Sequence, residues 1–358
     1  MYELLDQLSN VADKIKSLEN NREKLGQFLK EVKDSIQLSH PDILESRLTV
    51  KVNPDTLDKI KVIGIDGGLS QHEYHGMDMI LTRAVATVFE YAGGKLGNVE
   101  YFPSSIVTPK LTIITDPYND SDFTISTSIE RQKTEIDTAI KAFEKYNPEL
   151  ILLDGSILPH CNDKPGSNSM STKRYEDLLV MFRDLYKIAN GRLAGCIEDS
   201  RGRKFCEMIS EKILPNVQSD LVASLQKILA GTRDTNLLYH ILDTGERTCV
   251  FRFSKERAIE GLKTENIYTF YIKTAKYDRP VRVDFYAESD IIKTANKVAS
   301  IVLATSCHSS YGFPAPLIEA DCRAKLKEMD VDALHDQLVD RVGITPGMMK
   351  LRREQRPF

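Results

Sequence analysis

The sequence lacks the features that would carry the chain into or across a membrane. None of its apolar runs approaches the roughly 18 residues that a membrane-spanning helix needs. The first residues, Met1-Tyr-Glu-Leu-Leu-Asp6, contain neither the basic nor the apolar stretch of a signal peptide. We therefore expect a cytoplasmic protein without a membrane partner.

The sequence also lacks the residue spacings of several common sites. Its 6 cysteines are scattered and form no C-x-x-C pair, which predicts reduced thiols and argues against a zinc site or a disulfide framework. His72 and His75 are too isolated to complete a zinc site. A G-x-x-x-x-G-K-[ST] loop is absent, which argues against a Walker-type NTPase. Ser156 has no G-x-S-x-G frame, so it is not predicted to be a nucleophile.

Positive charge is not in excess. The formal net charge is −4, whereas proteins that bind nucleic acid over a broad surface are usually basic. Local basic segments at 173–174, 201–204 and 350–353, or a partner, would have to supply the positive charge for nucleic-acid binding. Taken singly, each segment is better explained as a solvated surface.

Two stretches share an unusual pattern, an apolar run followed by Asp, Gly and a small residue. Residues 61–68 contain Asp66, and residues 150–156 contain Asp154. Each apolar run is typical of a strand that is buried on both faces, and open α/β sheets place their sites at the carboxyl ends of such strands. We expect each Gly to turn the chain sharply after its Asp. The pair predicts two carboxylates that converge on a cation.

A two-metal site needs further carboxylates, and the sequence offers three on one predicted helix. Residues 125–146 have helical periodicity, with Glu130, Glu135 and Asp137 on them. Glu135 is our choice because small residues flank it, while Glu130 and Asp137 stay open as alternatives. Asp321, in a predicted helix over residues 316–328, is the fourth candidate, although an acid near a helix start also stabilises the helix dipole. Such oxygen ligands suit Mn²⁺ or Mg²⁺.

Two arginines are candidates for phosphate contacts. Arg201 follows a predicted strand that ends near residue 197, so we expect it at the same sheet edge as the two aspartates. Arg247 lies in a Gly-Glu-Arg turn before another predicted strand. For Arg247, a turn held by an ion pair is the equal alternative.

The spacing of apolar residues divides the chain into an N-terminal arm and an α/β core. Residues 1–37 have apolar residues at spacings of 3 and 4 and predict a helical arm, either a hairpin or a dimerisation element. From about residue 60, apolar runs alternate with helical patterns, and no linker splits them. We predict an N-terminal helical arm over 1–55 and one α/β domain over 56–358.

Five motifs in order resemble the NurA family of DNA-repair nucleases. Gly64-Ile-Asp66-Gly-Gly and Leu152-Leu-Asp154-Gly-Ser are similar to its two acidic strands. Residues 237–248 resemble its L-x-x-G-E-R-S stretch, residues 282–284 its R-x-E strand, and residues 311–321 its closing Y-P-x-P-L-x-x-A-[HD] helix. The resemblance covers roughly residues 60–330.

The resemblance implies an RNase H-like (Piwi-like) mixed sheet flanked by helices. It also implies a Mn²⁺-dependent nuclease, a 5′–3′ exonuclease and single-strand endonuclease, that resects the ends of DNA double-strand breaks. The implied partners are DNA, a second copy of the chain and a HerA-type hexameric ATPase. In this interpretation, Asp66, Glu135, Asp154 and Asp321 hold two Mn²⁺ or Mg²⁺ ions.

The chain departs from the family pattern at two places. Asp321 stands where relatives can carry His, which would make the site all-carboxylate. Glu198 stands where many relatives carry Lys, so Arg201 or Lys273 would have to provide that positive charge.

Two alternatives follow from the same residues. Asp-Gly-Gly after a strand also cradles nucleotide phosphates in actin-like and sugar-kinase-like phosphotransferases. The chain could instead be a non-catalytic partner of a DNA-translocating ATPase.

Overall fold

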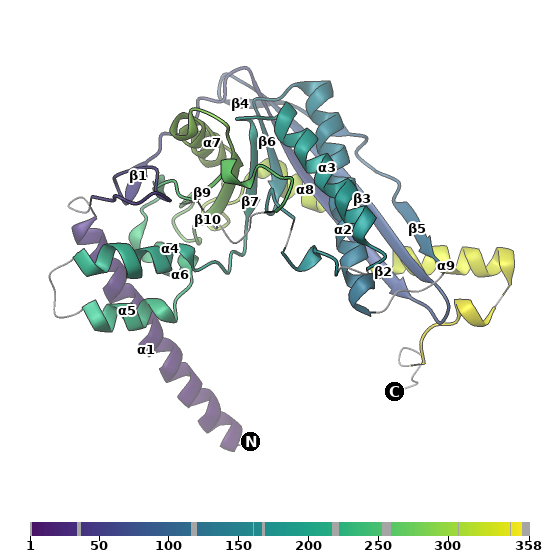
Figure 1. Ribbon diagram of the computed structural model, residues 1–358, viewed down its shortest axis with the longest axis horizontal. Coiled ribbons are helices and arrows are strands. Elements are labelled where there is room, and N and C mark those ends of the chain that lie inside the picture. Colours follow the sequence, from purple (N-terminus) through teal and green to yellow (C-terminus); the bar gives the residue numbers. More distant parts are fainter. Residues whose placement is uncertain are drawn as a thin grey trace. The chain divides into compact units, whose positions relative to one another are not determined.

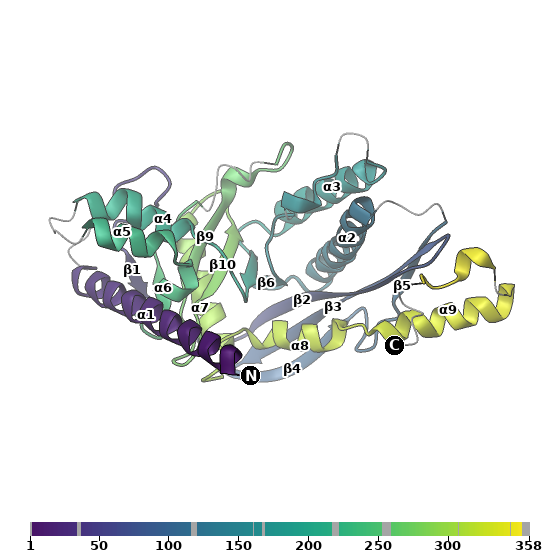
Figure 2. The same cartoon turned by 90° about the horizontal axis from the view of Figure 1, so that it is seen from below.

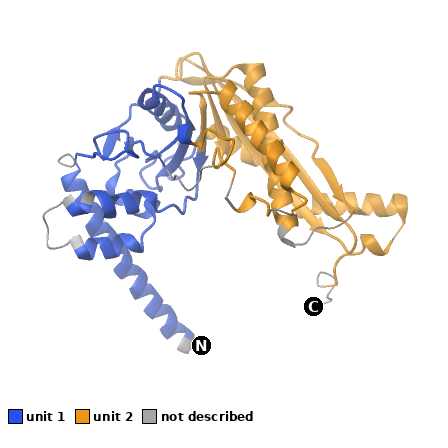
Figure 3. Cartoon of the chain, in the orientation of Figure 1, with its two compact units in different colours: residues 1–55, 196–258, 265–314 blue, residues 56–195, 259–264, 315–358 orange. Residues whose placement is uncertain are grey.

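The computed structural model describes residues 2–33, 37–115, 120–159, 161–166, 169–216, 222–252, 259–306, 308–343 and 345–352. These residues group into two compact units (Figures 1 and 3). Unit 1 comprises residues 1–55, 196–258 and 265–314, and unit 2 comprises residues 56–195, 259–264 and 315–358. The predicted arm over 1–55 thus groups with later segments of the chain, while its boundary with residue 56 is also a boundary between the units.

Unit 1 combines short strands with helices. Its strands, in the order in which they pair, are β1 (Thr49–Lys51), β8 (Glu246–Thr248), β9 (Ile267–Ile272) and β10 (Val281–Tyr286). Its helices are α1 (Tyr2–Val32), α4 (Lys204–Met208), α5 (Val222–Ala230), α6 (Asp234–Ile241) and α7 (Ile291–Thr305). A π-helical turn (Ile209–Ile213) continues α4, and 3₁₀ turns follow at Leu214–Asn216 and Thr264–Asn266. The adjacent strands are antiparallel.

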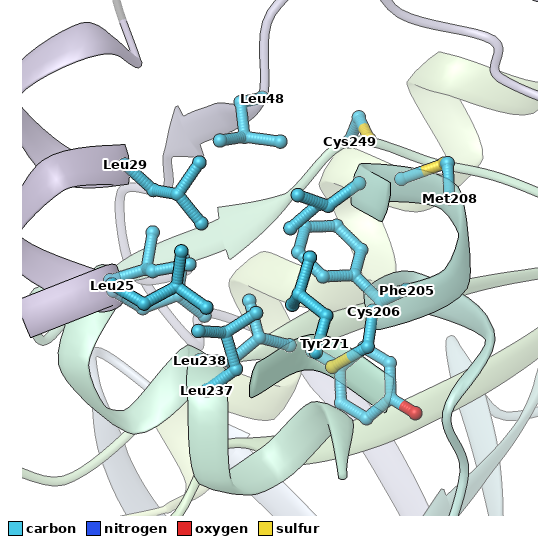
Figure 4. Close-up of a cluster of buried hydrophobic side chains, with 14 of the residues drawn as sticks. Leu25, Leu29, Leu48, Phe205, Cys206, Met208, Leu237, Leu238, Cys249 and Tyr271 are labelled. Carbon is cyan, nitrogen blue, oxygen red and sulfur yellow. The ribbon is translucent and has the colours of Figure 1, made fainter. Parts of the chain in front are cut away.

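The core of unit 1 holds the end of α1 in place. Leu25 and Leu29 of α1 are fully buried in one cluster with residues of α4 to α6 and strand β9, among them Phe205 and Tyr271 (Figure 4). The last eight residues of α1, from Leu25 to Val32, are therefore fixed by burial of apolar surface. Of the helix predicted over 1–37, Tyr2–Val32 is confirmed as a single helix, so the hairpin alternative is wrong. Residues 34–36 lie outside the described part.

Unit 2 is built on a larger mixed sheet. Its strands are β2 (Ile60–Glu73), β3 (Asp78–Ala92), β4 (Lys95–Phe102), β5 (Lys110–Ile114), β6 (Leu150–Asp154) and β7 (Leu193–Ile197), whose last two residues are counted with unit 1. Its helices are α2 (Asp120–Tyr146), α3 (Thr172–Ile188), α8 (Ala315–Ala324) and α9 (Glu328–Val342), with 3₁₀ turns at Cys161–Asp163 and Pro346–Met348.

The strand order in unit 2 is β7-β6-β2-β3-β4, with β5 also paired to β3. Strands β2, β3 and β4 form an antiparallel meander, and β6 pairs with β2 in parallel after the crossover through α2. Helix α8 covers one face of β2 and β3, and α2 with α3 covers the other (Figure 2). The predicted class, an RNase H-like mixed sheet flanked by helices, is confirmed by this arrangement.

The sequence explains the two central strands. Val62, Ile63 and Ile65 of β2 are at most 1% exposed, and Ile151 and Leu152 of β6 are fully buried. Strands covered on both faces need such continuous apolar runs. The register pairs Ile65 with Leu153, so Asp66 and Asp154, each the next residue, lie side by side.

None of the described helices is both long enough and apolar enough to span a membrane.

Candidate metal centre

The first predicted strand does not end at Asp66. β2 continues through Gly67 and Gly68 to Glu73, so the predicted sharp turn after Asp66 is wrong. Only Asp154 ends its strand, and there Gly155 turns the chain with a φ of +110°. The glycines after Asp66 have another role, which is to admit neighbours to the strand backbone.

Gly64 and Gly68 admit helix α8. A Cβ on Gly64 would lie 2.3 Å from the Pro316 carbonyl oxygen, and one on Gly68 would lie 1.8 Å from that of Ala324. Four strand residues span about 13 Å, and the eight helical steps from Pro316 to Ala324 span about 12 Å. Helix α8 therefore runs alongside β2 in the same direction.

This parallel course places Asp321. It lies just over halfway from Pro316 to Ala324, level with the middle of the strand segment, where Asp66 stands. The side chain of Asp321 is exposed, and its negative charge acts on Asp66.

Gly67 admits Glu135 from the opposite side. Alternate strand residues face opposite sides of a sheet, so Gly67 faces α2 where Gly64 and Gly68 face α8. A Cβ on Gly67 would lie 2.4 Å from both Cγ and Oε1 of Glu135. Only a residue without a side chain allows Glu135 this position.

The turn after Asp154 is fixed in a similar way. A Cβ on Gly195 of β7 would lie 2.2 Å from the carbonyl oxygen of Gly155. Two glycines in contact thus set the path of the chain where it leaves Asp154. The hydroxyl of Tyr186 donates to the carbonyl oxygen of Ile157 at 2.5 Å, which anchors the next part of this loop.

The carboxylates influence one another electrostatically. Burial raises the pKa of Glu135 to about 7, and the charges of Asp66 and Asp154 add to that shift. Burial also raises the pKa of Asp66, where the charge of Asp321 adds to the effect and the Gly67 N–H and Arg131 oppose it. Like charges forced together in a partly desolvated site favour the binding of a cation.

The other two acids on α2 are engaged elsewhere. Glu130 is 5% exposed, and its carboxylate lies 3.1 Å from the Lys110 ammonium and 3.7 Å from the Arg174 guanidinium. Asp137 pairs with Lys141 at 2.6 Å on the exposed face of the helix. Among the three alternatives, Glu135 is the one whose charge acts on Asp66 and Asp154.

Arg131 is a member of this centre that the sequence analysis did not single out. Its Nη1 lies 2.5 Å from Oε1 of Glu135, one helical turn away. Its positive charge lowers the pKa of both Glu135 and Asp66. The spacing of Arg and Glu four residues apart was visible in the sequence, but it is also the spacing of ordinary surface ion pairs.

The donor set fits a hard divalent cation. Asp66, Glu135, Asp154 and Asp321 offer carboxylate oxygens, the ligands that Mg²⁺ and Mn²⁺ take. Arg131 shows that the centre accommodates a positive charge. Within the described ranges, no three His, Cys, Asp or Glu side chains stand close enough together to hold a metal as they are placed. Binding by the four carboxylates would therefore involve side-chain rotation.

The predicted phosphate-binding residues lie in unit 1, and two of them are already used by local partners. Arg247 is 0% exposed, donates to both oxygens of Glu45 at 2.6 and 2.9 Å, and to Asn296 at 2.6 Å. The phosphate contact predicted for Arg247 is therefore wrong in this arrangement, because β8 pairs on both sides and buries it. The ion-paired alternative is what the structure contains.

Lys273 and Arg201 differ in their availability. The ammonium of Lys273 donates to the Tyr239 carbonyl oxygen at 2.9 Å and lies 4.2 Å from the centre of the Tyr239 ring. Burial lowers its pKa. Arg201 is exposed.

The sequence of this chain matches the family model of the NurA domain over residues 60–326. The chain belongs to the NurA family. This membership confirms the predicted family. The comparison with curated proteins finds no match.

Solved NurA structures share the fold. The NurA nuclease from Sulfolobus solfataricus is 16% identical, with 96% of this chain and 97% of that chain covered and a TM-score of 0.58. A NurA structure with manganese is 12% identical over 96% of this chain and 99% of that one, with a TM-score of 0.54. A NurA structure bound to dAMP and manganese is 11% identical over 97% and 99%, also with a TM-score of 0.54.

The same geometry argues against the phosphotransferase alternative. A nucleotide cradle needs open backbone at Asp-Gly-Gly, where phosphate oxygens could approach. Here Glu135 lies against Gly67, and Ala324 lies against Gly68. The glycines are covered by the protein itself.

Proposed function

We propose that this chain is a Mn²⁺- or Mg²⁺-dependent deoxyribonuclease that hydrolyses phosphodiester bonds at Asp66, Glu135, Asp154 and Asp321. The observation that carries the proposal is the position of Glu135, which reaches the strand backbone through Gly67 and interacts with the charges of Asp66 and Asp154. The charges of two strand carboxylates thus act on one helix carboxylate.

The residues of the chain have distinct tasks in this proposal. The four carboxylates would hold one or two ions, and the Gly67 N–H, which hydrogen-bonds Asp66, orients that carboxylate. Bound ions would lower the pKa of an attacking water and stabilise the charge on the leaving oxygen. Exposed Arg201, and Lys273 once released from Tyr239, are proposed to contact DNA phosphates.

We further propose that the substrate is a DNA end. The expected activities are 5′–3′ exonuclease and single-strand endonuclease cleavage, used to resect double-strand breaks. The family resemblance supports this proposal, and a NurA structure with bound dAMP shows that a family member accepts a deoxynucleotide.

The test is degradation of end-labelled linear DNA by the full chain with Mn²⁺, Mg²⁺ or EDTA. Label placed at the 5′ or the 3′ end reports the direction of cleavage. We expect Mn²⁺-dependent loss of label in the wild type, and none in Asp66→Asn or Asp154→Asn. Asp137→Asn is the matched control, because Asp137 pairs with exposed Lys141 on the same helix as Glu135. Mn²⁺-dependent cleavage by Asp66→Asn at the wild-type rate would contradict the assignment.

A homodimer is proposed from the first half of α1. Apolar residues repeat at alternating spacings of 4 and 3, the pattern of a coiled-coil seam. The first five members of this seam are 45–60% exposed, and after Arg22 the same spacing reaches Leu25 and Leu29, which are buried within unit 1. These five residues are Leu4, Leu8, Val11, Ile15 and Leu18.

Such an exposed seam is typical of a helix that pairs with another helix. The partner that we propose is α1 of a second copy. Sedimentation should show a dimer for the wild type and a monomer for Val11→Glu. Asn10→Glu adds the same charge off the seam and should leave the dimer intact. A Val11→Glu protein that remains dimeric would exclude this interface.

A HerA-type hexameric ATPase is the proposed motor partner, on the strength of the family resemblance alone. The expected result is that a HerA-type ATPase co-purifies with the chain and increases resection of duplex ends in the presence of ATP. The isolated chain should neither bind nor hydrolyse ATP. Saturable ATP binding by the chain alone would favour the phosphotransferase alternative.

A further inference from the structure

The charges of three carboxylates, Glu135, Asp66 and Asp163, act on Arg131. Its guanidinium pairs with Glu135, whose side chain is 13% exposed, while that of Arg131 is 34% exposed. Asp163 is 8% exposed. Glu135 first, and then Asp66 and Asp163, raise the pKa of the guanidinium against the effect of burial.

Asp163 is held in place by a neighbour of Arg131. The Gln132 side-chain amide donates to Oδ2 of Asp163 at 2.7 Å, and also to the Ser128 hydroxyl at 3.2 Å. Gln132 is itself 8% exposed. Helix α2 thus holds Asp163 through a buried hydrogen bond from the residue that follows Arg131, within range of the charge of Arg131.

A divalent cation and a guanidinium compete for the same carboxylate. Both are positive, so they repel each other when both approach Glu135. A partly buried guanidinium that leaves its carboxylate needs another anion, because an unpaired charge in that environment is costly. Asp163 is such an anion, and it already interacts with Arg131.

We propose that Arg131 is a positioning residue that exchanges partners, holding Glu135 until a divalent cation binds and then pairing with Asp163. This inference rests on the proposed metal-binding role of Glu135. It adds that the affinity for metal is set by the two partners of Arg131 as well as by the ligands.

The exchange predicts opposite effects for its two partners. Arg131→Met keeps most of the side-chain volume and removes the competing charge. If Arg131 holds Glu135 for about nine-tenths of the time, its removal raises the apparent affinity for Mn²⁺ about tenfold. Asp163→Asn removes the second partner of Arg131 and therefore weakens Mn²⁺ binding.

The test is calorimetric titration of the full chain with Mn²⁺ alone, at one pH and without DNA. We expect tighter binding for Arg131→Met, weaker binding for Asp163→Asn, and binding like Arg131→Met in the double variant. The double variant tests whether Asp163 affects Mn²⁺ binding only through Arg131, as the exchange requires. Arg131→Lys, which retains a charge but loses the guanidinium fork, should lie between wild type and Arg131→Met.

Lys141→Met is the matched control, because it removes the same kind of ion pair from an exposed part of α2. Circular dichroism establishes that each variant is folded. Unchanged or weaker Mn²⁺ binding in Arg131→Met, or a full effect of Asp163→Asn in the double variant, would overturn the exchange.

These outcomes are separate from failure of the proposed function. A wild type that binds Mn²⁺ and cuts DNA, with no change in affinity among the Arg131 and Asp163 variants, refutes only the exchange. A wild type that neither binds Mn²⁺ nor cuts DNA refutes both.

Discussion

Substitution of Gly67 by Ala tests whether the close approach of Glu135 to strand β2 is needed for activity. The new Cβ would lie 2.4 Å from Cγ and Oε1 of Glu135, whereas ordinary contacts begin at 3.4 Å. The carboxylate must therefore move by about 1 Å. A displacement of that size in a catalytic centre costs on the order of 100-fold in rate, or about 2.7 kcal/mol.

The fold should tolerate this change. Gly67 lies within β2 and does not have the left-handed backbone that L side chains avoid, so Ala can take its conformation. Only the flexible side chain of Glu135 has to yield. We therefore expect a folded protein, with a thermal unfolding midpoint close to that of the wild type, that has lost activity.

The assay is the initial rate of Mn²⁺-dependent degradation of end-labelled DNA, measured over a range of DNA concentrations. Gly97→Ala on strand β4 is the matched control, because its Cβ would come no nearer than 3.5 Å to the Glu90 carbonyl oxygen. Wild-type kcat/KM in folded Gly67→Ala would refute the reasoning. An equal loss of kcat/KM in Gly97→Ala would refute it as well.

Four further predictions concern the protonation of Glu135, proton release on metal binding, a buried ion pair and a loop. The pKa of Glu135 is raised from 4.5 to about 7, so ionisation of Glu135 opposes folding. The free energy of unfolding without added metal should therefore fall as pH rises from 4.5 to about 7. The fall should be smaller in Glu135→Gln. Binding of Mn²⁺ should correspondingly release about half a proton from Glu135 at pH 7 and almost none at pH 9. Calorimetry in two buffers measures this release. An equal release in Glu135→Gln would contradict the prediction. Glu45→Gln should lower the free energy of unfolding in urea by about 3–5 kcal/mol, because it leaves the fully buried Arg247 without its counter-charge. A loss below about 1 kcal/mol would mean that the ion pair is not desolvated. Gly195→Ala should lower nuclease activity by displacing Gly155 after the Asp154 strand, with little change if that turn can shift freely.

Burial patterns in the sequence were sufficient to find the framework of the centre. Two apolar runs ending in Asp predicted two buried strands with converging carboxylates, and the register of β2 and β6 places Asp66 beside Asp154. The 3.6-residue period located the helix that carries Glu135. These features depend on local pattern and on which faces are buried, and both are encoded in consecutive residues.

The glycines were misinterpreted because their role is tertiary. In the sequence, Asp-Gly-Gly is typical of a turn, but β2 runs on because helix α8 lies against Gly68 and Glu135 lies against Gly67. The residues that contact these glycines, Glu135 and Ala324, lie about 70 and 255 positions away in the sequence. Nothing near Asp66 in the sequence indicates either approach.

The roles of two arginines depend on distant residues for a related reason. Arg247 follows Gly-Glu, which indicates an exposed turn, but β8 pairs with strands on both sides and buries it beside Glu45. Arg131 was not singled out in the sequence, while in the fold it pairs with Glu135 and its charge acts on Asp66. Whether a charged residue is a surface group or part of a site depends on what packs over it.

The most direct test of the account is a crystal structure of the chain grown with Mn²⁺, with anomalous diffraction used to locate the ion. The account predicts manganese bound to carboxylate oxygens of Asp66, Glu135 and Asp154, with Arg131 turned from Glu135 towards Asp163. Manganese bound elsewhere, with Arg131 still paired to Glu135, would contradict the assignment of this centre.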